Sequence, residues 1–166
     1  MPDNTDILTL TQKFRHKVNG VVKFHEVDAF QVVHNLQYLL WTENARVEYC
    51  KELDINILSN KISANRAGIE SSGSIFLVHT DIDYYSPATF ADTYCVYTRA
   101  SKLGNSSLTF EHVITKLDNI DGAVVEILLC ISQAVEVYVD TSNQPMRIAD
   151  EIRNKIINFE KENLNS

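Results

Sequence analysis

The spacing of apolar side chains changes along the chain, and each change indicates a different element. Residues 18–27 are rich in β-branched and aromatic types, which predicts a first strand. From Leu36 to Leu53 the apolar residues recur at intervals of three and four, and Tyr38 and Trp41 widen the apolar surface beyond one stripe. No proline or glycine interrupts this segment. We therefore expect a long helix that is buried on most sides, with Asn35 as its N-cap.

The second half of the chain has the pattern of strands joined by turns. Residues 54–71, which are rich in Asn and Ser, predict a long loop. Asp121-Gly122 is a strong signal for a type I′ hairpin. The last strand is too long for a flat sheet, so we expect it to curl and to contain a bulge. The expected strands are Ser74–Tyr85, Thr93–Lys102, Ser107–Leu117 and Ala123–Val139.

The C-terminal segment has a helical period again. After Pro145, isoleucines and Phe159 recur on one face, which predicts an amphipathic helix over about 146–160. A central helix that is apolar nearly all round must be covered on several sides. We therefore predict an α+β protein with the hotdog fold, in which a strongly curved five-stranded antiparallel sheet wraps around the central helix. A single domain over residues 1–166, with its core at about 18–150, is the expected organisation.

Composition excludes several function classes. The chain has 166 residues, 45% of them hydrophobic, and a formal net charge of -7, so its overall field repels nucleic acids, anionic membranes and acidic carrier proteins. Three distant cysteines predict buried free thiols in a reducing compartment, and we expect a cytoplasmic protein. Charged and polar residues interrupt the apolar segment 123–139, which excludes a membrane helix there, and the first residues lack the pattern of a secretory signal.

Two segments resemble a known family. Residues 27–49, "VDAFQVVHNLQYLLWTENARVEY", are similar to the signature of the hotdog acyl-CoA thioesterases of the 4-hydroxybenzoyl-CoA thioesterase-like family. Residues 84–114, "YYSPATFADTYCVYTRASKLGNSSLTFEHVI", resemble the family's Tyr-x-x-Pro-x-x-x-Gly-Asp segment and the hairpin that follows it. The resemblance implies thioester hydrolysis at a site between two protomers, and hence a homodimer or homotetramer.

The resemblance also implies catalytic roles. Asp28 would be the nucleophile or the general base, and the sequence leaves both open. The backbone N–H of Asn35 would stabilise the oxyanion, because the first N–H groups of a helix have no partners within it. His34 is a further candidate beside them. The alternative for Asp28 is a loop carboxylate that only caps or electrostatically favours the helix.

Substrate contacts are predicted from both segments. Aromatic side chains near the helix start would line an acyl or aryl pocket, and cations and hydroxyls beside the Gly104-Asn105 turn would bind the CoA end. We read Glu43 as a buried partner of Arg46, with a second catalytic carboxylate as the alternative. No metal site and no cofactor are expected. The predicted substrate-binding residues are Phe24, Phe30, Tyr38, Pro87, Arg99, Ser101 and Lys102.

The chain departs from the family pattern at glycine positions. The family usually has glycine where this chain has Gln31 and Ala91, and often where it has Phe30. We expect Phe30 and Gln31 to narrow the turn beside the site. Replacing each with glycine should then cost about 0.5–1 kcal/mol of stability, because glycine raises the entropy of the unfolded chain.

Three functions fit these patterns. The leading hypothesis is an acyl-CoA thioesterase. The alternatives are hydrolysis of acyl groups carried on an acyl carrier protein, and a non-catalytic hotdog protein that binds acyl-CoA. Chain length and aryl preference do not follow from the residues.

Overall fold

The computed structural model describes residues 4–55, 74–162 and 164, with side chains from residue 7 onward. The predicted loop at 54–71 lies almost entirely outside these residues. The elements, in chain order, are α1 (Asn4–Thr11), β1 (His16–Val21), a 3-10 turn (Phe24–Glu26), α2 (Asn35–Glu52), β2 (Ser74–Tyr84), β3 (Thr93–Leu103), β4 (Ser107–Ile120), β5 (Ala123–Val139) and α3 (Asp150–Glu160).

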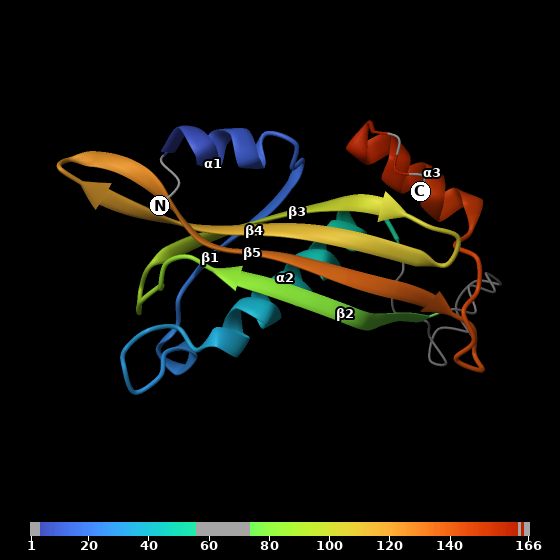
Figure 1. Cartoon of the computed structure of the whole chain (residues 1–166), viewed down its shortest axis with the longest axis horizontal. Coiled ribbons are helices and arrows are strands. Elements are labelled where there is room, and N and C mark those ends of the chain that lie inside the picture. The colour runs from blue at the N-terminus through green and yellow to red at the C-terminus, as the bar shows by residue number, and fades with distance from the viewer. Residues whose placement is uncertain (1–3, 56–73, 163, 165–166) are drawn as a thin grey trace.

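The strands form one antiparallel sheet in the order β1-β3-β4-β5-β2. Helix α2 lies along one face of this sheet, and α1 lies on the other (Figure 1). The sheet twists along its length, and α3 stands near the end where β3 and β4 are joined. The predicted α+β architecture, with a curved five-stranded sheet, a central helix and a C-terminal helix, is confirmed.

Some boundaries differ from the sequence prediction. Helix α1 was not predicted. The first strand ends at Val21 because the chain turns into the 3-10 segment at Phe24. Helix α3 begins at Asp150 rather than near Met146, because the N–H of Met146 donates to the Tyr138 carbonyl and Pro145 bridges to β5. These bonds hold residues 145–146 in an extended form.

The predicted turn and bulge are both present. Asp121 and Gly122 have φ angles of 52° and 83°, the left-handed values that a type I′ turn requires at both positions. In β5, the pairing with β4 shifts between Cys130 and Leu128, so one extra residue is inserted into the long strand. The bulge lets a strand of 17 residues follow the curvature of the sheet.

Aromatic side chains fill the space between α2 and the sheet. Trp41 stacks on Tyr94 of β3, with ring centroids 3.9 Å apart and planes at 13°. Toward the other end of α2, Tyr49 contacts Phe110 of β4 edge to face at 5.4 Å. All four rings are removed largely or wholly from solvent, which accounts for the broad apolar surface of the helix.

The two edges of the sheet differ. Strand β1 pairs only with residues 93–98 of β3, and the rest of that edge is covered by the C-terminal segment. There, the N–H of Ala100 donates to Glu160 Oε1 at 2.8 Å, and the N–H of Leu103 donates to the Leu164 carbonyl at 2.9 Å. At the opposite edge, β2 has no neighbouring strand beyond it. The long open edge of the described sheet is therefore that of β2.

A buried ion pair joins α2 to β5. Arg46 Nε lies 2.8 Å from Glu136 Oε1, and the two side chains are only 9% and 11% exposed. Burial raises the pKa of the Glu136 carboxyl, although Arg46 acts in the opposite direction. The prediction that Glu43 is the buried partner of Arg46 is wrong: Glu43 is exposed, and Arg46 reaches across to the sheet instead.

Candidate functional site

Asp28 lies in the turn of a short hairpin that precedes α2. Val27 pairs with Val33, the N–H of Asp28 donates to the Val32 carbonyl at 2.9 Å, and the N–H of Gln31 donates to the Asp28 carbonyl at 3.0 Å. The Asp28 carboxylate is half-buried, and its Oδ1 accepts the N–H of Phe30 at 2.8 Å. No partner of Oδ2 is found among the described residues, so this oxygen is available for chemistry.

The hairpin explains why the family prefers glycine at position 31. A three-residue loop of this kind is a type I turn followed by one left-handed residue. Gln31 occupies that position with a φ of 64°. Ala91, which also stands where the family has glycine, has a φ of 69°. The left-handed region costs a non-glycine residue of order 1 kcal/mol, so both positions are strained in this chain.

We therefore expect Gln31→Gly to leave the free energy of unfolding unchanged or to raise it by up to about 1 kcal/mol. The relief of left-handed strain offsets the entropy that glycine adds to the unfolded chain. From the sequence alone we predicted that glycine at position 31 would lower the free energy of unfolding. The positive φ of Gln31 changes that prediction. Phe30→Gly is the matched control, since Phe30 has no positive φ and should lose about 0.5–1 kcal/mol. Urea denaturation of both variants is the measurement, and an equal loss at the two positions would contradict the strain argument.

Helix α2 begins with a free N–H group. The N-cap is His34 rather than Asn35, and its Nδ1 accepts the N–H of Leu36 at 3.2 Å. The N–H of Gln37 donates to the His34 carbonyl at 2.8 Å. For the N–H of Asn35, no acceptor is found within residues 4–55, 74–162 and 164. An N–H without an acceptor at the positive end of an 18-residue helix can donate a hydrogen bond to an anionic group.

The cap is compatible with one tautomer of neutral His34. Nδ1 accepts the N–H of Leu36 only when the ring proton is on Nε2, and the same N–H also donates to Asn35 Oδ1 at 3.0 Å. The side chain is exposed, so this Nε2–H faces solvent. His34 thus has a capping role and retains one donor at the start of α2.

Glu26 is a buried carboxylate that the sequence reasoning missed. It is 6% exposed and lies two residues before Asp28. Its oxygens accept the N–H of Lys23, the side-chain amide of Gln37 and the indole N–H of Trp41. The sequence does contain a pattern that could have predicted this contact. A glutamate three residues after the start of a helical turn, as Glu26 is after Lys23, often accepts the backbone N–H of the residue at that start.

Residues 84–114, the second segment that resembles the family, contact the first segment, residues 27–49. The N–H of Val33 donates to the Ala88 carbonyl at 2.8 Å, and the N–H of Ala88 donates to the Tyr38 hydroxyl at 3.0 Å. Burial opposes ionisation of Asp92, but hydrogen bonds from the Thr89 N–H and from Lys116 outweigh it and lower the pKa of the Asp92 carboxyl. The segment 86–92 is thereby held as a fixed support for the hairpin.

The predicted acyl-pocket residues divide into two groups. Tyr38 is buried in the core beneath α2, and burial raises the pKa of its hydroxyl. Phe24, Phe30 and Pro87 are exposed at the end of the molecule where α2 begins. The ring of Phe24 contacts the ring of Phe90 edge to face, with centroids 6.0 Å apart. Phe30 is 87% exposed, so within one chain its ring faces solvent, and its effect on the turn beside the site stays a prediction.

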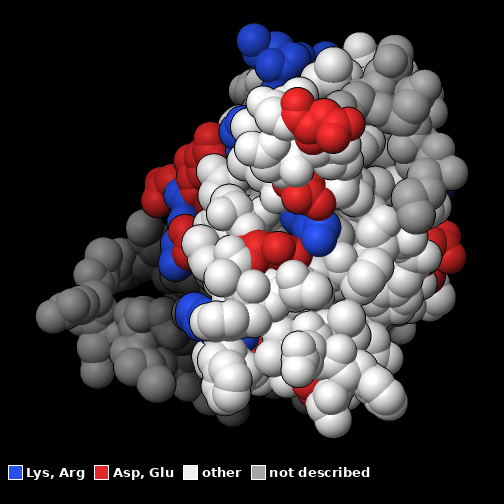
Figure 2. All heavy atoms as spheres, turned by 90° about the vertical axis from the view of Figure 1, so that its left-hand side faces the viewer, with Lys and Arg blue, Asp and Glu red and all other residues white. Residues whose placement is uncertain are grey.

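This end of the molecule carries few charges. Uncharged atoms cover most of the face in Figure 2, and the Lys and Arg atoms visible there lie in separate groups interspersed with Asp and Glu. A continuous basic patch is not seen on this face.

The residues predicted to bind the CoA end lie elsewhere in the chain. Arg99, Ser101 and Lys102 are on the second half of β3, whereas the hairpin contacts the loop that precedes the first residue of β3. Arg99 is also engaged, since its guanidinium lies 2.9 Å from Glu111 and 3.2 Å from Glu162. The structure therefore does not bring these three residues together with Asp28 within one chain.

Other nucleophiles and metals find no support in the described part of the chain. Cys50, Cys95 and Cys130 are free and buried, as predicted. Burial raises the pKa of Cys50 and Cys130 to about 12, so neither thiol is reactive. Among the described residues, no group of three or more His, Cys, Asp or Glu could hold a metal ion. None of the described helices is long and apolar enough to cross a membrane.

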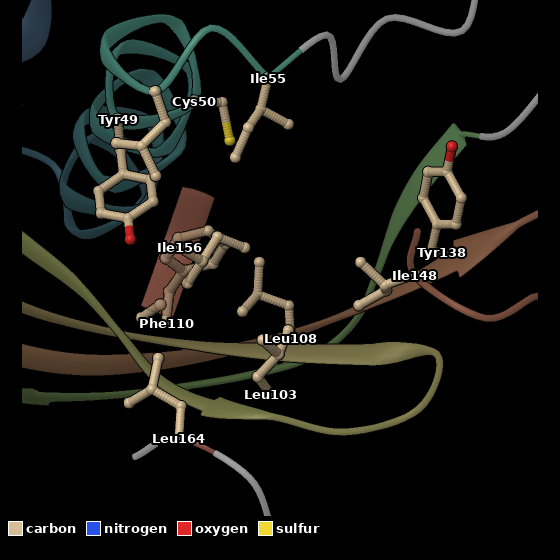
Figure 3. Close-up of a cluster of buried hydrophobic side chains, with 12 residues drawn as sticks. Tyr49, Cys50, Ile55, Leu103, Leu108, Phe110, Tyr138, Ile148, Ile156 and Leu164 are labelled. Atoms are coloured by element: carbon tan, nitrogen blue, oxygen red, sulfur yellow. The ribbon is translucent and has the colours of Figure 1, made fainter. Parts of the chain in front are cut away.

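A small apolar cavity lies at the other end of α2. Its volume is about 20 Å³, and the walls include Tyr49, Cys50, Tyr138 and Ile148 (Figure 3). Glu136, the partner of Arg46, is the one charged residue in its lining. A space of this size holds at most about one water, and it is remote from the N-terminus of α2, so it forms no part of the Asp28 site.

Sequence comparison gives one family match and distant relatives. Residues 22–156 match the model of the thioesterase-like superfamily. The acyl-acyl carrier protein thioesterase ATL3 of Arabidopsis thaliana, a chloroplastic protein, is 26% identical over 144 residues, which cover 87% of this chain and 68% of that protein.

Solved structures share the fold. A thioesterase from Thermus thermophilus, in complex with coenzyme A and zinc, superposes with a TM-score of 0.69 at 24% identity, covering 92% of this chain and 99% of that one. A 1,4-dihydroxy-2-naphthoyl-CoA thioesterase from Synechocystis gives a TM-score of 0.69 at 18% identity, covering 85% and 94%. The hotdog fold predicted from the sequence is thus confirmed.

Proposed function

Since the chain belongs to the thioesterase-like superfamily and is a thioester hydrolase, we propose that it cleaves acyl-CoA to a free acid and CoA, as the 4-hydroxybenzoyl-CoA thioesterase-like enzymes that it resembles do. The observation that carries this proposal is the free N–H of Asn35 at the start of α2, next to the hairpin that bears Asp28. An oxyanion donor and an available carboxylate are the two groups that thioester hydrolysis needs.

The proposed reaction begins with the thioester carbonyl at the N-terminus of α2. The Asn35 N–H and the helix dipole stabilise the negative charge that develops on the carbonyl oxygen. Asp28 either attacks the carbonyl carbon and forms a mixed anhydride, or removes a proton from the water that attacks it. The thiolate of CoA then leaves. In the second route it takes up the proton that Asp28 removed from the water, and in the first route it is protonated by solvent. The Nε2–H of His34 is a candidate hydrogen-bond donor to the leaving sulfur.

The alternative role of Asp28 as a mere helix cap receives little support from the geometry. The group that caps α2 is His34, and Asp28 Oδ1 bonds to the N–H of Phe30 inside its own turn. A carboxylate whose second oxygen has no partner among the described residues is better suited to catalysis than to capping.

A thiol-release assay over short, long and aromatic acyl-CoAs tests the function. We expect hydrolysis of at least one class, with a rate well above the uncatalysed reaction. Binding of acyl-CoA without release of free CoA across the whole panel would favour the non-catalytic binder instead.

A second candidate is hydrolysis of acyl groups on an acyl carrier protein, which the relationship to the Arabidopsis acyl-acyl carrier protein thioesterase favours. The net charge of -7 opposes docking of a whole acidic carrier protein, which favours CoA. Comparing kcat/KM for one acyl group as its CoA and its carrier-protein thioester separates the two functions.

We also expect a homodimer or homotetramer. No described strand lies beyond the long edge of β2, and Phe76, Leu77 and Val78 on this strand are 45%, 50% and 58% exposed. Light scattering should give two or four times the chain mass of 18.9 kDa. A lysine at the β2 edge, Val78→Lys, should shift the protein toward the monomer, whereas Val124→Lys, at the tip of the β4–β5 hairpin, should not. A single 18.9 kDa species for the wild type at micromolar concentration would contradict the prediction.

A further inference from the structure

We propose that Glu26 is a positioning residue of the thioesterase site, and that its carboxylate clamps the hairpin carrying Asp28 onto the first two turns of α2. This inference rests on the proposed function, because it concerns the geometry between Asp28 and the Asn35 N–H. Glu26 itself is not proposed to touch the substrate.

The contacts of Glu26 reach both sides of the site. Oε2 accepts the N–H of Lys23 at 2.7 Å, while Oε1 accepts Gln37 Nε2 at 3.0 Å and Trp41 Nε1 at 3.1 Å. Its backbone carbonyl accepts the N–H of His34 at 2.9 Å. One residue thus bonds to the chain before the hairpin, to the N-cap of α2 and to two side chains of the helix.

These hydrogen bonds can fix the distance between the hairpin that carries Asp28 and the start of α2. A buried carboxylate with three donors forms charge-assisted hydrogen bonds that are weakly screened by solvent. Trp41 is itself held by stacking on Tyr94, so the indole N–H is a fixed donor. Asp28 lies two residues after Glu26, and Asn35 lies two residues before Gln37. The clamp therefore connects the two reacting groups by a short and rigid path.

Other contacts keep the hairpin in place without Glu26. Val33 remains bonded to Ala88, and Ala88 remains bonded to Tyr38. Loss of the clamp should accordingly loosen the hairpin rather than unfold it. A displacement of about 1 Å in a catalytic constellation is enough to lower the rate by roughly a hundredfold.

Glu26→Gln is the test, and Glu160→Gln is its matched control. Glu160 is 3% exposed and bonds in the same way near the other end of α2, where its Oε1 accepts the Tyr49 hydroxyl at 2.7 Å and the Ala100 N–H at 2.8 Å. We expect kcat of Glu26→Gln to fall by roughly a hundredfold with KM changed by less than about threefold, and kcat of Glu160→Gln to stay within about threefold of the wild type. The acidic limb of the pH profile should persist in Glu26→Gln, since the residue positions the base and is not the base.

A milder variant tests the proposal even if Glu26→Gln does not fold. Trp41→Phe keeps an aromatic ring for stacking but removes one donor to Glu26, and should lower kcat by roughly tenfold. A folded Glu26→Gln enzyme with wild-type kcat would overturn the proposal, and so would wild-type kcat in Trp41→Phe if Glu26→Gln does not fold. Loss of the acidic limb would also overturn it, because Glu26 would then be the titrating group.

Hydrogen exchange gives a readout that does not depend on turnover. In Glu26→Gln, amides of residues 26–36 should exchange faster than in the wild type, while in Glu160→Gln they should not. If the wild type cleaves no thioester, the proposed function fails, yet this exchange pattern still tests the clamp. Equal exchange of residues 26–36 in wild type and Glu26→Gln would overturn it.

Discussion

Asp28→Asn should lower kcat by roughly a hundredfold or more, equivalent to about 3 kcal/mol of activation free energy, while leaving the fold intact. The amide of asparagine is neither a nucleophile nor a general base. Its Oδ1 can still accept the N–H of Phe30, so the turn should keep its shape. Initial rates of thiol release, together with far-UV circular dichroism, are the measurements.

Asp140→Asn is the matched control for this experiment. Asp140 is also a turn aspartate whose Oδ1 accepts backbone N–H groups, those of Ser142 and Gln144, but it follows β5 and is remote from the start of α2. Its rate should equal that of the wild type. Wild-type activity in Asp28→Asn would show that the catalytic assignment is wrong.

Isotope labelling can reveal covalent attack by Asp28, because only that route places ¹⁸O in the protein. In a single turnover in H₂¹⁸O, direct attack by water places ¹⁸O in the product acid. Attack by Asp28 followed by hydrolysis of the anhydride at the Asp28 carbonyl places ¹⁸O in the protein instead. Mass spectrometry of product and protein distinguishes these outcomes.

The largest expected effect on stability comes from Arg46→Ala. Removing the guanidinium leaves the Glu136 carboxylate buried without its ion-pair partner, and breaking a buried pair in this way typically costs about 3–5 kcal/mol. The free energy of unfolding from urea denaturation is the measurement. Lys51→Ala is the control, because Lys51 pairs with Glu48 on the surface of the same helix and should change stability by less than about 0.5 kcal/mol.

A double variant tests whether the loss of stability in Arg46→Ala comes from the charge left on Glu136. Replacing both members of the pair, with Arg46→Met and Glu136→Leu, removes the uncompensated charge, and apolar replacement of a buried pair is often neutral or stabilising. We expect the double variant to recover most of the loss seen in Arg46→Ala. No recovery would indicate that the stem of Arg46, rather than the charge left on Glu136, accounts for the effect.

Local patterns predicted the elements well because they depend on neighbouring residues. The central helix was expected at Leu36–Leu53 and occurs at Asn35–Glu52, since its three- and four-residue period is long and uninterrupted. Helix α1 was missed because its eight residues carry no clear period, and its packing depends on Ile7 meeting Val113 and Leu128 of distant strands. Short helices are stabilised mainly by such tertiary contacts.

The candidate site was predicted only where a motif marked it. Asp28 and Asn35 were proposed from the family pattern, and the positive φ of Gln31 explains physically why that pattern has a glycine. Glu26 was missed because its partners Gln37 and Trp41 come into reach only when the hairpin folds back on α2. Arg46 was paired with the wrong carboxylate for a similar reason, since Glu136 lies on a strand far along the sequence.

The unequal edges of the sheet limit how copies of this chain can assemble. With α3 and Leu164 covering half of β3, a copy that pairs through β2 would leave only the six residues of β1 as an open edge on the opposite side of the described sheet. A chain that ended before Asp150 would uncover the N–H groups of Ala100 and Leu103 and offer a second site for strand addition. We expect loss of the C-terminal helix to lengthen the edge that is open to strand addition and so to favour larger assemblies.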